Sequence, residues 1–212
     1  MTGLFIGEKH TYSDFGLRLI SIVVSPPEAV VVHKEIPGMD SVLDLSESFG
    51  EVKYRNRSLV AEFNMEEQDN EKFHERFSEI CNYMHGTKQE ILLDSDSSFF
   101  YKGRISVSSS SQGCVHKITI AADVQPYKFK REKTVIATTV NNEATIVCRN
   151  LRKHVVPIIK ADAEFQIAFE GIWYAIPSGE IKMADLVLKA GENVIKCIGT
   201  GNIIFEYQEG GL

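Results

Sequence analysis

Short runs of alternating apolar and polar residues dominate this chain, and such runs predict β-strands. The clearest run, from Val115 to Val124, places His116, Ile118, Ile120, Ala122 and Val124 on one face. Prolines and glycines interrupt the runs, as is typical of antiparallel strands joined by turns. In the first part of the chain the predicted strands are 18–25, 30–36, 59–65, 90–94, 99–107 and 115–124. The pattern therefore predicts a mainly β protein.

One segment follows a helical period instead and predicts an α-helix over about 70–85. Its apolar positions are Phe73, Phe77, Ile80, Cys81 and Met84. Asp69 or Asn70 can cap the start, and Gly86 can adopt the left-handed conformation after the last turn. We expect this helix to lie across a sheet face, where Phe77→Ala would cost about 3–5 kcal/mol.

A break in the pattern from Gln125 to Lys133 predicts a domain boundary. Pro126 cannot donate a ladder hydrogen bond and biases Gln125 towards an extended conformation. Four cationic residues follow within 128–133, as in a solvated linker. We therefore expect an N-terminal domain, 1–130, that is β-sandwich-like with one helix, and a C-terminal domain, 131–212. One continuous β-domain with a proline bend is the alternative.

The C-terminal region consists of short apolar runs separated by turn residues, which predicts a β-sandwich or jelly roll. The expected strands are 134–140, 143–149, 163–169, 172–176, 181–188, 194–198 and 203–207. The expected turns are Asn141-Asn142, Pro177 to Gly179, Ala190 to Asn193 and Gly199 to Asn202. Asn141-Asn142 in particular predicts a two-residue hairpin turn.

Between Gly38 and Arg57 the chain has no regular period, although it contains Leu43, Leu45, Phe49 and Tyr54. A loop of this length in a compact domain is usually functional or mobile. Its apolar groups need a partner, so we expect an interface with a neighbouring subunit. A head-to-tail ring would satisfy every copy when the rotation closes.

The composition limits the classes of protein to which this chain can belong. The 212 residues are 43% hydrophobic and 25% charged with a net charge of −6, which indicates an ordinary globular protein. The charge is spread evenly along the chain, which argues against a basic nucleic-acid-binding module. The first residues lack the pattern of a signal peptide, and no apolar run approaches the ~20 residues of a membrane span. Synthesis in the cytoplasm is the expectation.

Candidate chemistry is weak throughout, and we expect no catalytic residue, no metal ligand and no cofactor. Asp94 to Ser98 begins like a calcium loop, but Phe99 and Ile105 stand where glycine and glutamate are needed. Gly199-Thr200-Gly201 lacks the third glycine and following helix of a phosphate loop. The serines from Ser108 to Ser111 are expected at a hairpin tip, with no residue placed to activate them.

The remaining reactive side chains also form no recognisable centre. No two of the six histidines are spaced i,i+4, and the cysteines lie far apart without zinc-ligand spacing. We expect Cys81, Cys114, Cys148 and Cys197 to be free buried thiols. Trp173 and Tyr174 could stack on sugar rings, but their apolar strand favours core packing, with Trp173 inward.

Several segments, taken in order, resemble the distal tail protein family of long-tailed, non-contractile bacteriophages. They are Phe15-Gly16-Leu17, Ile36 to Leu45, Tyr54-Arg55-Asn56-Arg57, His85-Gly86, Ile91 to Asp94, Phe100 to Arg104 and Pro126-Tyr127-Lys128. Looser similarity continues at Leu186 to Leu188, Gly191 to Asn193 and Gly199 to Tyr207. Ser41 departs from the pattern, because glycine is expected there.

This resemblance implies a structural protein of a phage or prophage virion rather than an enzyme. The N-terminal domain would form a hexameric ring at the tail tip, joining the tail tube to the tail-tip or baseplate proteins. The C-terminal domain would be a galectin-like sandwich. DNA would pass through the ring without specific binding, which an acidic protein favours. The competing hypothesis is a carbohydrate-binding protein that recognises cell-surface glycans through Trp173 or Tyr174.

Overall fold

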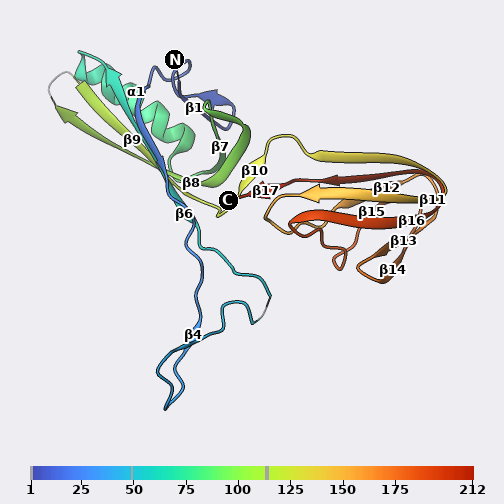
Figure 1. Cartoon of the computed structure of the whole chain (residues 1–212). Coiled ribbons are helices and arrows are strands. Elements are labelled where there is room, and N and C mark those ends of the chain that lie inside the picture. The colour runs from blue at the N-terminus through green and yellow to red at the C-terminus, as the bar shows by residue number, and fades with distance from the viewer. Residues whose placement is uncertain (1, 49, 113–114) are drawn as a thin grey trace. The chain divides into compact units, whose positions relative to one another are not determined.

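The computed structural model describes residues 2–48, 50–112 and 115–212, without the side chains of 111, 112 and 115. The chain divides into two compact units, Met1–Lys128 and Phe129–Leu212. Both are built mainly of antiparallel strands (Figure 1). The predicted mainly β class is therefore confirmed.

The first unit contains one large antiparallel sheet in the order β2-β1-β7-β8-β9-β6-β3. Its strands are β1 (Leu4–Ile6), β2 (Lys9–His10), β3 (Arg18–Val24), β6 (Arg57–Glu66), β7 (Lys88–Leu93), β8 (Asp96–Gln112) and β9 (Val115–Val124). β9 is buried along the predicted face, from His116 to Val124. β8 is longer than expected, because Ser108 to Ser111 pair with Thr119 to His116 in the ladder. The expected serine hairpin tip is therefore wrong, and Gly113 lies outside the described residues.

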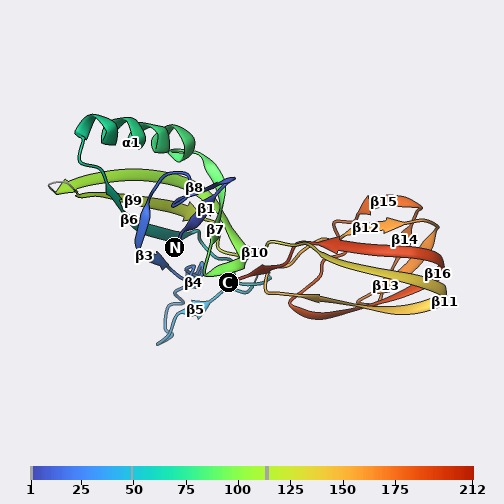
Figure 2. The ribbon, with the colours of Figure 1, turned by 90° about the horizontal axis from the view of Figure 1, so that it is seen from above.

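Helix α1 (Asn70–Met84) lies over this sheet, as expected (Figure 2). The side chain of Asp69 accepts a hydrogen bond from the backbone N–H of Glu71 and so caps the helix. Gly86 follows with a φ of +76°, which a residue with a side chain would rarely adopt. Phe73, Ile80 and Met84 are buried.

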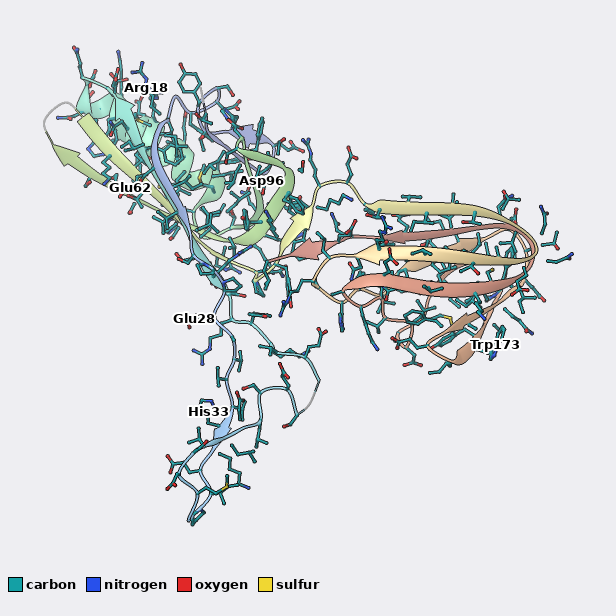
Figure 3. The ribbon with its side chains drawn as sticks, in the orientation of Figure 1. Arg18, Glu28, His33, Glu62, Asp96 and Trp173 are labelled. Carbon is teal, nitrogen blue, oxygen red and sulfur yellow. The ribbon has the colours of Figure 1, made fainter. Side chains whose placement is uncertain are left out.

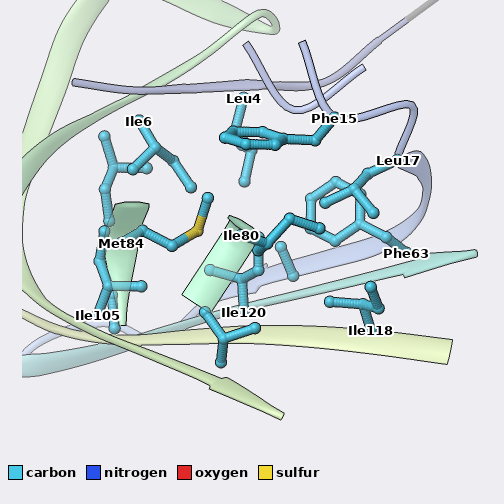
Figure 4. Packing of buried hydrophobic residues seen from close by; sticks show 14 of the residues in the cluster. Leu4, Ile6, Phe15, Leu17, Phe63, Ile80, Met84, Ile105, Ile118 and Ile120 are labelled. Carbon is cyan, nitrogen blue, oxygen red and sulfur yellow. The ribbon is translucent and has the colours of Figure 1, made fainter. Parts of the chain in front are cut away.

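The core of the first unit lies between α1 and the concave side of the sheet. Ile80 and Met84 approach Ile105 and Ile120 of the sheet (Figure 4). Leu4, Phe15 and Leu17 from the N-terminal segment close the other side of this core. Phe77, by contrast, is only half-buried, so it lies at the border of the core rather than inside it.

The second unit has a sheet in the order β14-β13-β16-β12-β15, with β11 also paired to β16. Its strands are β11 (Thr134–Asn150), β12 (Ile158–Ala161), β13 (Phe165–Phe169), β14 (Ile172–Ile176), β15 (Gly179–Lys182) and β16 (Gly191–Tyr207). The first half of β16 pairs with β13, and its second half pairs with β12. Phe165, Ile167 and Phe205 pack in one shared core.

β11 and β16 pair continuously over 17 residues each, so two expected turns are wrong. Asn141-Asn142 and Gly199 to Asn202 face each other inside this ladder. Asn142 has a φ of +70°, and Gly199 and Gly201 have φ values of +150° and +145°. An added Cβ at Gly199 would lie 2.5 Å from Cδ1 of Phe165. These residues therefore allow a local bend and close packing inside paired strands, rather than a chain reversal.

The predicted cationic linker is more ordered than expected. Lys128–Lys130 forms β10, which pairs with β17 (Gly210–Gly211). Within the second unit, the ammonium group of Lys130 lies 2.9 Å from a carboxylate oxygen of Glu209. Exposed linker residues remain only from Arg131 to Lys133. Lys130, which we expected in a solvated linker, is therefore held in an ion pair instead.

Candidate functional site

A long excursion of the first unit, residues 26–56, leaves the sheet between β3 and β6; we call it the arm. Pro26 and Pro27 end β3, because neither can donate a ladder hydrogen bond. At the base of the arm, the backbone N–H of Arg55 donates to the carbonyl oxygen of Glu28 (2.8 Å), and that of Val30 donates to Lys53 (2.8 Å). Further out, β4 (His33–Lys34) pairs with β5 (Leu43–Asp44). The arm is therefore a narrow antiparallel ribbon.

The arm contributes nothing to the described hydrophobic core of its own unit. Figure 3 shows it projecting from the sheet, with Glu28 and His33 along its length. Its large exposed apolar side chains are Val31, Val32, Met39, Val42 and Leu43, each at least 41% exposed. An apolar ribbon without a core of its own is a typical feature of an assembly surface.

The arm is also acidic. It contains six carboxylates, at Glu28, Glu35, Asp40, Asp44, Glu47 and Glu51, against Lys34, Lys53 and Arg55. All six carboxylate residues are exposed. The hydroxyl and backbone N–H of Ser46 donate to Asp44 and lower the pKa of its carboxyl group. The arm therefore presents apolar groups together with ionised carboxylates.

β3, from which the arm departs, is an edge strand that pairs only with β6 in this sheet order. Ile20 and Val23 are 51% and 61% exposed on it. The register shifts between Leu19 and Ser21, and such a bulge disfavours uncontrolled pairing along an edge. This edge extends the apolar surface of the arm onto the body of the first unit.

Arg57, at the start of β6, is only 7% exposed. Its guanidinium carbon lies 4.9 Å from the centre of the Tyr101 ring, a cation–π contact worth up to about 2 kcal/mol when desolvated. Its Nε and Nη2 atoms are buried without a hydrogen-bond partner in the described structure. Burial lowers the pKa of this group, because desolvation disfavours the charged form.

A cavity of about 620 Å³ lies next to the start of β6. It is lined by Asn56 to Ser58 of the arm base and β6, His85 and Gly86 after α1, Arg104 to Ser106 of β8, and Ala121 to Asp123 of β9. Arg104 donates to the carbonyl oxygen of Gly86, and Asn56 donates to Asp123 at 2.9 Å. Sequence reasoning missed this site, although Arg57 is in phase with the buried positions Leu59 and Ala61.

In the second unit, Trp173 is 56% exposed, so the expected inward packing is wrong (Figure 3). The reason is strand alternation on edge strand β14, where Ile176 and Tyr174 turn towards the core. Trp173 pairs with Ala168, whose small side chain covers little of the indole ring. The hydroxyl of Tyr174 donates to the carbonyl oxygen of Asp185 at 3.4 Å.

The other sequence candidates occupy structural positions. Asp94 accepts a hydrogen bond from the backbone N–H of Gly3 at 2.7 Å and lies 3.1 Å from Nε2 of His10. Cys81, Cys148 and Cys197 are free thiols, and burial raises the pKa of Cys148 to about 12. Cys114 lies outside the described residues. Among the residues that the structure describes, no group of three or more His, Cys, Asp or Glu could hold a metal ion.

No helix within the described ranges is long and apolar enough to span a bilayer. Comparison with protein-family models finds no match, and comparison with curated proteins finds none either.

Among solved structures, the chain is similar to the crystal structure of the SPP1 Dit protein (gp 19.1). That protein is described as a paradigm of the hub adsorption apparatus in phages that infect Gram-positive bacteria. The TM-score is 0.73 with 13% identity, over 98% of this chain and 99% of the other. At this identity the likeness establishes the fold. The resemblance to distal tail proteins is thus confirmed at the level of the fold.

Proposed function

We propose that this chain is a structural hub subunit at the distal tip of a long, non-contractile phage tail, encoded by a phage or prophage. The SPP1 hub protein supports this role, because its fold is shared over nearly the whole length of both chains. The role requires assembly rather than catalysis.

The observation that carries the proposal is the arm, which exposes Val31, Val32, Met39, Val42 and Leu43. In a head-to-tail assembly each copy offers its arm to the next copy and receives one in return. All arms are covered only when the rotation closes into a ring. Residues 1–130 would build this ring, and the edge of β3 would add to its interface.

The finer features follow from the resemblance to distal tail proteins. The ring has six copies and joins the tail tube to the tail-tip or baseplate proteins. Residues 131–212 form a galectin-like sandwich, and DNA passes through the ring without specific binding. Assembly takes place in the bacterial cytoplasm, and the mature location is the tail tip of the virion.

The test replaces residues 31–52 with Asn-Gly, a sequence that favours a two-residue hairpin turn. The hydrogen bond between Val30 and Lys53 brings the two cut ends together, so the shortened ribbon can close. Light scattering after size exclusion at micromolar concentration then compares the variant with the full chain. The full chain should form a closed particle, and the variant should be a folded monomer.

A second variant keeps the arm and changes only three of its apolar side chains: Val31→Ser, Val32→Ser and Val42→Ser. This variant should also weaken assembly, because the apolar contact is removed while the ribbon remains. Both proteins should be compared in the presence of the tail tube protein, since a ring can close on its neighbour. Assembly that is unchanged in the shortened variant contradicts the proposed role of the arm.

A second candidate function, glycan binding by the second unit, is supported by the exposure of Trp173 (56%). An exposed indole on a sheet face beside a small residue can stack on a sugar ring. Trp173 is the one tryptophan of the chain, so its fluorescence reports binding directly. A saturable shift with a host-wall polysaccharide supports this function if calorimetry, which needs no tryptophan, detects binding to the parent but none to folded Trp173→Ala. The absence of a shift and of heat excludes it for that polysaccharide.

A further inference from the structure

The outer sheet face of the second unit presents an aromatic ring and a cation in one cross-strand row. Trp173 of β14 is directly opposite Ala168 of β13, and Ala168 is directly opposite Lys196 of β16. Directly opposed residues of antiparallel strands point to the same face of the sheet. The neighbouring residues Ile167 and Ile195 are buried, so the row faces away from the core. Trp173 and Lys196 therefore share the outer face, with only the small side chain of Ala168 between them.

The spacing of this row suits a ligand that lies across the strands. Adjacent strands are about 4.8 Å apart, so the backbones at Trp173 and Lys196 are about 10 Å apart. Both side chains are exposed, and that of Ala168 is too short to fill the space between them. Thr145 of β11 continues the row opposite Lys196 and adds an exposed hydroxyl group. An extended ligand can thus contact an aromatic ring, a cation and a hydroxyl group in sequence.

The ammonium group of Lys196 is free to attract an anionic group. Other exposed cations of this unit are already paired, Arg149 with Glu192 at 2.9 Å and Lys189 with Glu170 at 2.6 Å. Lys196 makes no ion pair with any residue that the structure describes. Its charge is therefore not compensated on the sheet.

Two carboxylates on the same side of the sheet limit where an anion can lie. Glu143 is on β11, diagonally across from Lys196, and β13 and β16 separate it from Trp173. Glu164 precedes β13 and is four residues from Ala168. Neither carboxylate lies between the ring and the cation. The favourable part of the face is thus the stretch from Trp173 to Lys196.

The position of the lysine also distinguishes between kinds of partner. Val194 and Ile198 flank Lys196 on β16 and are 51% and 42% exposed. A protein partner would bury this centre, but lysine is depleted from the buried centres of protein interfaces. A sugar chain stays hydrated along its edges, so its anionic group can meet the ammonium group without full desolvation. The face therefore favours a glycan over a protein.

We propose that this face binds an acidic polysaccharide, with Trp173 stacked on a sugar ring and Lys196 paired with an anionic group on a neighbouring sugar unit. This inference rests on the glycan-binding function proposed above for the second unit and names its substrate class. Stacking and a compact ammonium charge depend little on the stereochemistry of individual hydroxyl groups. One acidic oligosaccharide can therefore represent the class in a test.

Calorimetry on the full-length chain compares the hexamer of galacturonic acid with maltohexaose, its uncharged counterpart. At about 0.1 M salt, long-range repulsion by the net charge of −6 is largely screened, and what remains of it disfavours the acidic hexamer. The acidic hexamer should nevertheless bind roughly two- to fivefold more tightly, the range expected for one exposed ion pair. About 1 M sodium chloride should remove this difference.

Three variants separate the contributions of the ring and the cation. Lys196→Gln should abolish the preference for the acidic hexamer and leave the binding of maltohexaose unchanged. The matched control, Lys182→Gln, removes an exposed lysine from β15 and the same unit of charge, and it should keep the preference. Trp173→Ala should weaken the binding of both hexamers at least about tenfold. Circular dichroism checks the fold of each variant, and the exposed Lys196 still tests the preference if Trp173→Ala does not fold.

The outcomes distinguish this inference from the function on which it rests. Equal binding of the two hexamers, unaffected by Lys196→Gln, refutes the acidic class but leaves glycan binding in place. The absence of heat with either hexamer refutes both, and a fluorescence shift of Trp173 with the tail tube protein would then identify the face as a protein contact. Hexametaphosphate is a polyanion without sugar rings; if it binds as well as the acidic hexamer, and Trp173→Ala weakens neither, the proposed stacking is wrong.

Discussion

Two phenylalanines on α1 should differ sharply in their contributions to stability. The ring of Phe73 is 3% exposed and stacks on the ring of His116, with centroids 3.7 Å apart and an angle of 11°. Phe77 stacks more loosely on Phe73, at 5.9 Å, and is only half-buried. The sequence predicted a cost of about 3–5 kcal/mol for Phe77→Ala, whereas the structure assigns a cost of that size to Phe73→Ala.

The magnitude follows from the area that each ring removes from water. Phe73→Ala leaves a cavity in a closed core and should cost about 3–5 kcal/mol of unfolding free energy. Loss of the stacked contact with His116 adds to the upper part of this range. Because Phe77 is half-buried, truncating it loses only about half of the transfer free energy of a buried ring. Phe77→Ala should therefore cost about 1.5–2.5 kcal/mol.

Urea unfolding followed by two probes measures this difference. Circular dichroism at 222 nm follows α1 in the first unit, whereas Trp173 fluorescence follows the second unit. Phe73→Ala should lower the midpoint of the helix transition more than Phe77→Ala, with similar slopes. The fluorescence transition should stay where it is in both variants. Equal costs, or a larger cost for Phe77→Ala, would refute the packing described here.

Two further changes test particular contacts. Gly103→Ala should cost about 3 kcal/mol of stability in the first unit, since the new Cβ would lie 2.6 Å from Cα of Val124, and closer still to the Asp123 carbonyl oxygen. A thermal midpoint within about 1 °C of wild type would contradict that geometry. Hydrogen bonds from Lys133 and Lys160 lower the pKa of Glu206 from 4.5 to about 2. Its stabilising contribution is therefore complete above pH 4.5 and lost as the pH falls through about 2. Glu206→Gln should flatten the pH dependence of second-unit stability in this window, whereas Glu192→Gln, on the same strand, should not.

The local sequence was sufficient to predict burial where its apolar period and the tertiary packing select the same side chains. The helical period at Phe73, Ile80 and Met84 places these residues in the core, and Asp69 caps the helix as expected. Alternation from His116 to Val124 gives the buried face of β9. In these segments burial follows directly from periodicity, so no information about distant parts of the chain is needed.

Local sequence was insufficient where pairing over long range decides the conformation. Asn141-Asn142 has turn-forming residues, but both are paired in the ladder with β16, so the chain bends there without reversing. In the same ladder, the segment from Gly199 to Gly201 is paired with β11 instead of forming a turn. For Trp173, the apolar strand suggested burial, whereas its outward phase opposite Tyr174 and Ile176 gives exposure. Strand phase was therefore more informative than the apolar character of the segment.

The candidate site was only partly predictable for a similar reason. The lack of periodicity after Gly38 correctly indicated a segment without a core, but the arm begins earlier, at Pro26. Arg57 was assigned to the end of the loop, although its phase with Leu59 and Ala61 predicts an inward side chain. The cavity next to the start of β6 is also lined by His85 and Arg104, which only the folded sheet brings together.

The mass of the assembled particle tests the central claim most directly. The chain has a mass of 23.8 kDa, so six copies give about 143 kDa. Light scattering of the full-length protein should find this mass alone, or this mass plus that of the bound partner when the tail tube protein is present. It should also find that replacing residues 31–52 abolishes the assembly. A full-length chain that remains at 23.8 kDa under both conditions would contradict the account.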